Sequence, residues 1–272
     1  MRPTQRFTLI TVSLSLASAD TTFVAGASRG LGLELARAFA TAPGSHVVHA
    51  TTRSPPHRIG ALGRINGVQP HMLDVSNATQ VDDVARSVFT SGAAVDLVLH
   101  NAGINNGTLE HQMEVNAVAP FRLVEAFMPA LLRSQHKRVC IVTSNRGQQY
   151  YVRKFRARFN GKRGAKLCRD VAYCAYAVSK GAAHATFRRL EPAWRAKGIT
   201  AVVLHPGGLA TDMNGGLEHC LTRKQAAKSS RRKANECISA AMRAPDIQRI
   251  CSSLTPADAG KFLDWTRQEL AW

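Results

Sequence analysis

The chain has 272 residues, of which 45% are hydrophobic and 20% charged, a composition typical of a globular protein long enough to bury a large core. No apolar run reaches the length of a membrane-spanning helix, so we expect no membrane span. The six cysteines form no C-x-x-C pair and no histidine cluster has zinc spacing, so we expect no metal site.

The formal net charge of +18 is concentrated in two stretches. Residues 146–170 hold nine Lys or Arg and one acid, and residues 223–233 hold six Lys or Arg and no acid. Charge runs usually form solvated loops, which is the interpretation we favour. An acidic surface or a nucleic acid is the alternative partner, but only Phe155 and Phe159 interleave with the charges, so we do not expect nucleic-acid binding.

The first 20 residues differ in character from the rest. Arg2 and Arg6 precede a hydroxyl-rich apolar run that ends in Ala17-Ser18-Ala19, a pattern similar to a weak secretory signal or a transit peptide. We predict a leader over residues 1–20, ahead of one domain over residues 21–272. Because cysteines without partners suit a reducing compartment, we expect a cytoplasmic protein, with an organellar or secretory destination as the alternative.

From residue 21 onward, strand patterns alternate with helix patterns. The predicted strands are Thr21–Gly26, His46–Thr51, Val68–Leu73, Val95–His100, Arg138–Ser144, Ile199–His205 and Lys261–Trp265. The predicted helices are Gly30–Thr41, Asn77–Thr90, Leu109–Arg133 (as one helix or two) and Ala175–Lys197. This alternation predicts an α/β fold: a single Rossmann-type, doubly wound parallel sheet with helices on both faces.

A glycine-rich loop joins the first strand to the first helix. Gly26, Gly30 and Gly32 have the spacing G-x-x-x-G-x-G. Glycines there let the backbone turn tightly and approach a pyrophosphate, which then lies at the helix N-terminus. A glycine trio alone is a weak signal, but its place at the start of a βαβ series favours a dinucleotide site.

The charges near this loop favour one dinucleotide over the other. An NAD-dependent enzyme usually has an acid near the end of the second strand to bind the ribose 2′-hydroxyl. This chain has no acid between Glu34 and Asp74 and instead offers Arg29 and Arg53. Because arginine binds phosphate well, we predict NADP(H) in preference to NAD(H).

Seven motifs follow one another in an order that is known from one family. They are Gly26 to Gly32, Asp74-Val75, Asn101-Ala102-Gly103, Asn116 in V-N-A-V-A-P, Ser144 to Gly147 as S-x-x-G, Tyr176-x-x-x-Lys180, and Pro206-Gly207 followed by Thr211. In this set the chain resembles the short-chain dehydrogenase/reductase family, and HPGGLATDM with the C-terminal stretch resembles its C-factor and sniffer-type carbonyl reductase branch. Ala25 departs from the family pattern, because a threonine whose hydroxyl helps to fix the loop normally stands there.

The resemblance implies roles for these residues. The catalytic set would be Asn116, Ser144, Tyr176 and Lys180. The cofactor-binding set would be Gly26, Ser28, Arg29, Gly30, Leu31, Gly32, Arg53, Asp74, Val75, Asn101, Ala102, Gly103, Tyr176, Lys180, Pro206, Gly207 and Thr211. The family also often forms homodimers or homotetramers through long helices, here including residues 175–197.

The chemistry of the tyrosine and lysine can be argued from their spacing. A phenol is a sluggish acid or base at neutral pH, and a nearby cation lowers its pKa. Lys180 follows Tyr176 by four residues, so both project from one face of a helix. Tyr150 and Lys154 share this spacing, but Tyr150 lies too close to Ser144 and lacks the long helix that follows Tyr176.

One departure from the family is large. Tyr176 lies 32 residues after Ser144, and the surplus is a basic insertion at about residues 148–172. A long insertion is tolerated if it loops out at the surface, so we expect it to protrude near the mouth of the site. It would cap the substrate pocket, bind an anionic partner or reflect a gene-model artefact.

We therefore predict an NADP(H)-dependent oxidoreductase that interconverts a small-molecule carbonyl and an alcohol, with Tyr176 as the acid/base. The alternative is a catalytically impaired cofactor-binding signalling protein whose basic segments bind an anionic partner. Residues Leu217–Met242 are expected to form a lid over the substrate, and their basic content hints at an anionic substrate.

Overall fold

The computed structural model of the chain describes residues 20–44, 46–55, 59–89, 92–148, 171–214 and 238–272. Seven parallel strands in this part of the chain form one sheet in the order β3-β2-β1-β4-β5-β6-β9. The strands are β1 (Asp20–Ala25), β2 (His46–Thr52), β3 (Val68–Met72), β4 (Leu97–His100), β5 (Arg138–Val142), β6 (Thr200–His205) and β9 (Phe262–Asp264). The predicted doubly wound sheet is confirmed.

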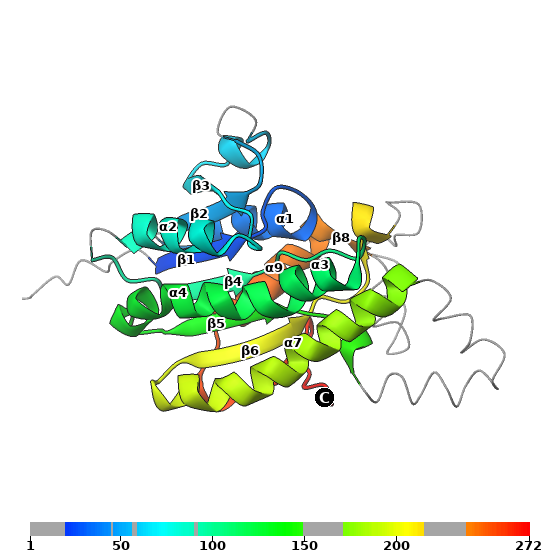
Figure 1. Ribbon diagram of the computed structural model, residues 1–272. Coiled ribbons are helices and arrows are strands. Elements are labelled where there is room, and N and C mark those ends of the chain that lie inside the picture. The colour runs from blue at the N-terminus through cyan, green and yellow to red at the C-terminus, as the bar shows by residue number, and fades with distance from the viewer. Residues whose placement is uncertain (1–19, 45, 56–58, 90–91, 149–170, 215–237) are drawn as a thin grey trace, which may run out of the picture.

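Helices cover both faces of this sheet (Figure 1). One face carries α2 (Ala78–Phe89), α4 (Ala119–Arg133) and α7 (Val171–Ala196). The other face carries α1 (Gly30–Ala40) and α9 (Ala240–Ser252). Because both faces are covered, successive strand residues enter opposite cores: Phe23 and Ala25 belong to the first core, and Val24 belongs to the second.

The segment predicted as one long helix or two is a helix with an irregular turn. It consists of α3 (Leu109–Met113), a π-helical turn over Glu114–Val118 and α4. By length and apolarity Leu109–Arg133 could cross a membrane, but 67% of its most apolar window is buried inside the protein. Its burial is explained by its place in the core, and the π turn positions Asn116 within the fold, as described below.

The C-terminal third differs from the prediction at one helix. The expected lid over Leu217–Met242 falls largely on residues 215–237, outside the described part of the chain. Its last residues instead form β8 (Ile238–Ser239), which pairs with β7 (Leu209–Ala210), and the first turn of α9. Helix α9, which contains Pro245, was not predicted.

Two other predicted boundaries shift. Asp20 already belongs to β1, so the predicted leader overlaps the first strand by one residue, and residues 1–19 lie outside the described part. Most of the predicted basic insertion, residues 149–170, also lies outside it. Helix α7 begins at Val171, four residues before the predicted start.

Candidate active site

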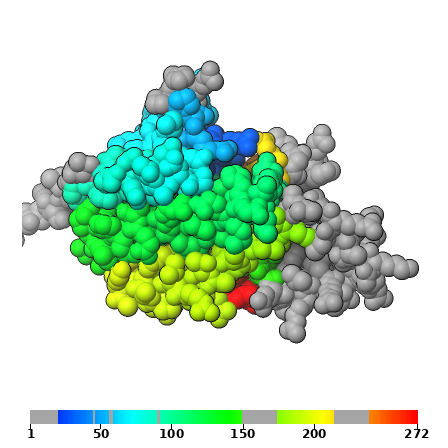
Figure 2. All heavy atoms as spheres, viewed as in Figure 1, coloured from blue at the N-terminus to red at the C-terminus, as the bar shows by residue number. Residues whose placement is uncertain are grey.

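A cavity of about 910 Å³ lies at the carboxyl ends of the parallel strands. Loops after β1, β2, β3, β4, β5 and β6 contribute to its lining, and Figure 2 shows a recess between the blue, green and yellow surfaces at this end of the molecule. The strand order reverses between β1 and β4. Ligands of doubly wound sheets bind in the crevice at such a reversal.

Most of the predicted site residues line this cavity. They are Gly26, Ser28, Arg29, Gly30, Leu31, Arg53, Asp74, Val75, Asn101, Ala102, Gly103, Ser144, Tyr176, Lys180, Pro206, Gly207 and Thr211. Gly32 and Asn116 are not among the lining residues, and each contacts the residues that are. Ser144 and Tyr176 therefore border one cavity although 32 residues separate them in the sequence.

Two glycines of the loop, Gly26 and Gly32, are packed too closely to carry side chains. A Cβ added to Gly26 would lie 2.6 Å from the Cα of Ala102, and the φ of Gly26 is +79°. A Cβ on Gly32 would lie only 2.0 Å from the carbonyl oxygen of Gly26. Gly32 thus closes the loop against its own first residue, and its predicted contact with the cofactor stays a prediction.

The threonine hydroxyl that usually fixes this loop is missing, because Ala25 stands at that position. Neighbouring segments hold the loop instead. The amide of Gly26 donates to Thr51 Oγ1 at 2.9 Å, and the side-chain amide of Asn101 donates to the Gly26 carbonyl at 2.9 Å. The amide of Ala27 also donates to the Thr51 carbonyl at 2.7 Å. The loop is therefore anchored to β2 and to the segment after β4, so Ala25 does not leave it unsupported.

Two arginines and the N-terminus of α1 contribute positive charge to the glycine-loop end of the cavity. The first turn of α1 holds no acid, so its backbone N–H groups and helix dipole favour an anion there. Arg29 and Arg53 are exposed and line the cavity. Burial opposes ionisation of Asp74, but hydrogen bonds from Ser76 and the charge of Arg53 outweigh it and lower the pKa of Asp74. This interaction places Arg53 near the Asp74 carboxylate.

Ser144 caps the short 3-10 helix η4 (Asn145–Gly147) that follows β5. Its Oγ accepts from the backbone amide of Arg146 at 3.2 Å. A hydroxyl has one proton to donate besides its acceptor lone pairs. The Ser144 hydroxyl can therefore direct that proton to a group bound in the cavity.

Contact between η4 and α7 keeps Ser144 beside the tyrosine helix. A Cβ added to Gly147 would lie 2.6 Å from the carbonyl carbon of Lys180 and 2.7 Å from the amide of Gly181. Only glycine permits so close an approach of two backbones. The glycine of the S-x-x-G motif thus packs against the turn of α7 that carries Lys180.

Lys180 and Tyr176 lie one turn apart on α7, as the spacing predicted. The Lys180 ammonium is 5.7 Å from the centroid of the Tyr176 ring and donates to the Val142 carbonyl at 3.4 Å. Lys180 is buried, and burial lowers its pKa to about 8. The side chain therefore carries a positive charge at neutral pH and places it beside the phenol ring.

Asn116 lies behind the cavity wall, with its side chain fully engaged. Its Oδ1 accepts from the Ile104 amide at 2.9 Å, and its Nδ2 donates to the Ile104 carbonyl at 2.7 Å and to Ser179 Oγ at 2.9 Å. A Cβ on Gly103 would lie 3.2 Å from Asn116 Oδ1 and 3.4 Å from Lys180 Nζ. Asn116 therefore joins the loop after β4 to α7 next to Lys180.

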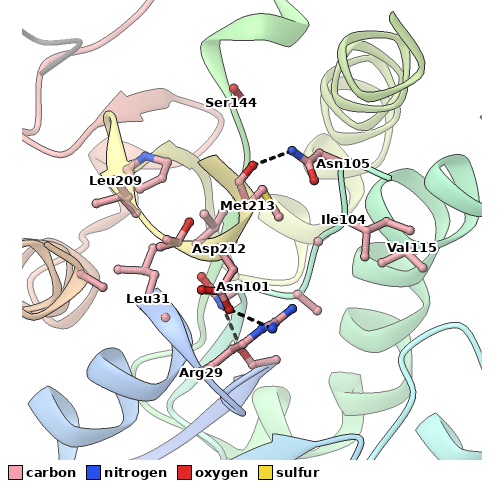
Figure 3. A pocket seen from close by; sticks show the side chains of 18 of the residues that line it. Arg29, Leu31, Asn101, Ile104, Asn105, Val115, Ser144, Leu209, Asp212 and Met213 are labelled. Atoms are coloured by element: carbon pink, nitrogen blue, oxygen red, sulfur yellow. Dashed lines mark hydrogen bonds and ion pairs between the residues drawn. The ribbon is translucent and has the colours of Figure 1, made fainter. Parts of the chain in front are cut away.

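A segment after β7 crosses the cavity and is tied to both of its walls (Figure 3). The Asp212 carboxylate pairs with Arg29 at 2.9 Å, and the Asn105 side chain donates to the Met213 carbonyl at 2.8 Å. We call residues 211–214 the strap. Sequence reasoning included Thr211 but missed Asn105, Asp212 and Met213, and the only signal was their position next to predicted motifs.

His205 is another lining residue that sequence reasoning missed. His205 ends β6 directly before Pro206 and lines the cavity. Burial is the main reason that its pKa falls to about 4. The imidazole is therefore neutral at physiological pH. The lysine and arginines among the described lining residues are Lys180, Arg29, Arg53 and Arg146.

Comparison with known proteins agrees with this architecture. Residues 20–155 match the family model for short chain dehydrogenases. The chain is 27% identical to the C-signal protein of Myxococcus xanthus over 192 residues, which cover 65% of this chain and 93% of that protein.

Two solved structures show the same fold. The NADPH-bound carbonyl reductase from chicken fatty liver has a TM-score of 0.74 and 23% identity, covering 93% of this chain and 99% of that one. The carbonyl reductase Sniffer of Drosophila melanogaster has a TM-score of 0.73 and 20% identity, covering 94% of this chain and all of that one. With half of its length matched by the family model, its seven motifs in order and its strands in the same fold, this chain belongs to the short-chain dehydrogenase family of oxidoreductases.

Proposed function

We propose that this protein interconverts a small-molecule aldehyde or ketone and the matching alcohol, with NADP(H) as the cofactor. The observation that carries the proposal is that Ser144, Tyr176 and Lys180 border the same cavity as the glycine loop. The NADPH-bound carbonyl reductase with the same fold supports the choice of reaction.

The residues present fit a phosphorylated dinucleotide. The cavity volume of about 910 Å³ is within the range of cofactor sites. Gly26 and Gly30 leave the backbone bare at the start of α1, where a pyrophosphate would be held. Arg29 and Arg53 would bind the 2′-phosphate, and Asp74, Val75 and the Asn101–Gly103 stretch would border the adenosine. Pro206, Gly207 and Thr211 would lie over the nicotinamide.

When bound, the cofactor would supply or accept the hydride. The chain's own task is to manage the proton and to orient the substrate. Tyr176 Oη would donate its proton to the carbonyl oxygen during reduction and take it back during oxidation. The Lys180 ammonium, next to the ring, would stabilise the phenolate that remains.

Ser144 and Asn116 would support this proton transfer in different ways. The Ser144 hydroxyl would donate a hydrogen bond to the same carbonyl oxygen and hold it in line for reaction. Asn116 would act as a positioning residue, because it binds Ser179 and the loop after β4 instead of the cavity. The predicted proton path through Lys180 with support from Asn116 stays a prediction.

The test is an NADPH-oxidation screen over aldehydes and ketones with the wild-type chain and Tyr176→Phe. We expect turnover in the wild type and a loss of roughly 10²- to 10⁴-fold in kcat for the variant, with NADPH binding retained. Equal turnover by Tyr176→Phe would contradict the assignment.

The alternative, a cofactor-binding signalling protein with impaired catalysis, stays a prediction. Its basic segments fall largely on residues 149–170 and 215–237, outside the described part of the chain. Tight NADPH binding without turnover of any carbonyl or alcohol in the screen would favour it.

A further inference from the structure

The C-terminal residues fold back under the active site. After β9 the chain reverses: the Asp264 amide donates to the Gln268 carbonyl at 2.8 Å, and the Leu270 amide donates to the Phe262 carbonyl at 2.7 Å. Asp264 steadies the turn by accepting from the amide and hydroxyl of Thr266 at 2.8 and 2.6 Å. The last residues are thereby directed beneath α7, where the C-terminus lies in Figure 1.

The last side chain occupies an aromatic cluster at this position. The Trp272 ring lies 5.7 Å from Phe187 in a stacked arrangement, 5.5 Å from Phe262 and 5.6 Å from His184 edge to face. The Arg188 guanidinium lies 5.7 Å from the same ring. These contacts come from α7 and β9, so they hold the final residue in one place.

At this position, the last two residues are linked to both ends of residues 143–148, the segment that carries Ser144. At one end, His184 contacts Trp272 and its Nε2 forms a hydrogen bond of 2.9 Å with Thr143 Oγ1, directly before Ser144. At the other end, the Gln148 side-chain amide donates to the Ala271 carbonyl. Figure 2 shows the red C-terminal end beside the green segment that follows β5.

Contacts between described residues hold the segment after β5 in place. Residues 149–170, which link Gln148 to α7 along the chain, lie outside the described part. On the described residues, three contacts fix the segment after β5: Gly147 packs against the backbone of α7 at Lys180, Thr143 bonds to His184 on α7, and Gln148 bonds to Ala271. The last two of these contacts involve Ala271 or the His184 ring that packs against Trp272.

We propose that Ala271 and Trp272 are positioning residues that hold the Ser144 segment at the catalytic tyrosine. This inference rests on the proposed function, and it adds a role for the C-terminus and for Gln148 and His184. The C-terminal backbone carbonyl and indole ring act through Thr143 and Gln148, and they do not touch the substrate or the cofactor.

The most direct test is Gln148→Ala, which removes one hydrogen bond and no aromatic packing. We expect kcat to fall roughly ten-fold or more, because small misplacements of reacting groups are costly, while the Kd for NADPH stays within about two-fold. The matched control is Gln248→Ala, which removes a comparable bond to Ser252 on α9, far from the site, and should leave kcat unchanged. In a Ser144→Ala background, Gln148→Ala should cause no further loss, because its effect passes through Ser144.

A second pair of variants tests the indole ring. Trp272→Ala should lower kcat with the stoichiometry of NADPH binding retained, and Trp272→Phe should restore most of it by keeping the aromatic contacts. If Trp272→Ala fails to fold, Gln148→Ala still tests whether the C-terminal residues position the Ser144 segment.

Amide hydrogen exchange gives a readout that needs no turnover. We expect faster exchange over residues 143–148 in Gln148→Ala than in the wild type or in Gln248→Ala. Wild-type kcat together with wild-type exchange in Gln148→Ala would overturn the positioning role. A wild-type chain that turns over no carbonyl would instead refute the proposed function, so the two failures are distinguishable.

Discussion

The two sides of the cavity differ in how far apart in the sequence their chain segments lie. The glycine-loop side, which we define as residues 25–75, consists of consecutive strand–loop units after β1, β2 and β3. The tyrosine side, which we define as the lining residues from Asn101 to Thr211 together with their supports, joins segments that are far apart in sequence. The first side is built mainly from segments that follow one another in the chain, with Asn101 and Ala102 as its distant supports, whereas the second depends throughout on tertiary contacts between η4, α7, the strap and the C-terminus.

Because of this difference, the same kind of substitution should affect a different property of the protein on each side. A backbone fault on the glycine-loop side should weaken cofactor binding. A backbone fault on the tyrosine side should leave the cofactor bound and disturb the chemistry. The following predictions test this comparison, from the largest expected effect to the smallest.

Gly147→Ala and Gly26→Ala form a matched pair. Each added Cβ would lie 2.6 Å from backbone atoms, of Lys180 in the first case and of Ala102 in the second. We expect Gly147→Ala to lower kcat by roughly 100-fold with little change in NADPH affinity, since it moves Ser144 away from α7. Gly26→Ala should instead raise the Kd for NADPH. Steady-state kinetics and cofactor fluorescence measure both, and the same kinetic pattern in both variants would contradict the division.

Arg53→Ala should weaken NADPH binding by about ten-fold or more and leave NADH binding nearly unchanged. The reason is the loss of a charge-assisted hydrogen bond to the 2′-phosphate, which typically contributes about 1.5–3 kcal/mol. Isothermal titration with the two cofactors measures the difference. An equal loss of affinity for NADPH and NADH would show that Arg53 does not recognise the 2′-phosphate.

The pH dependence of carbonyl reduction should report Lys180. Burial lowers its pKa to about 8, so the ammonium is present below that pH and is lost above it. We expect kcat/KM for NADPH to be level below about pH 8 and to fall by up to about ten-fold per pH unit above it. Arginine stays charged in this range, so Lys180→Arg, if active, should lack the decline. A wild-type profile that stays level to pH 10 would contradict this role.

Asp212→Asn should have the smallest effect. The pair between Asp212 and Arg29 is largely exposed, with 71% and 73% of the side chains accessible, and such pairs add about 0–1 kcal/mol. Since the 2′-phosphate and Asp212 would compete for Arg29, we expect NADPH to bind up to a few-fold more tightly in the variant at low salt. Weaker NADPH binding would show that Asp212 helps to form the site.

The same comparison explains what could be predicted from the sequence. The sheet, the glycine loop and the helix that carries Tyr176 follow from local periodicity and from motifs. The roles of Gly32 and Asn116 in packing, the strap bond from Asn105 to Met213 and the contact of Gln148 with Ala271 depend on tertiary neighbours. No spacing rule connects Gln148 with Ala271, so only the fold could reveal that pair.

The most direct measurement of the central claim is a double-mutant cycle between Ser144 and Tyr176. Residues that act as a unit on one substrate oxygen lose their effects non-additively. We therefore predict that Ser144→Ala combined with Tyr176→Phe lowers kcat/KM for a carbonyl substrate little more than the more damaging single variant does. Losses that multiply in full would show that the two residues act independently and would contradict a shared catalytic site.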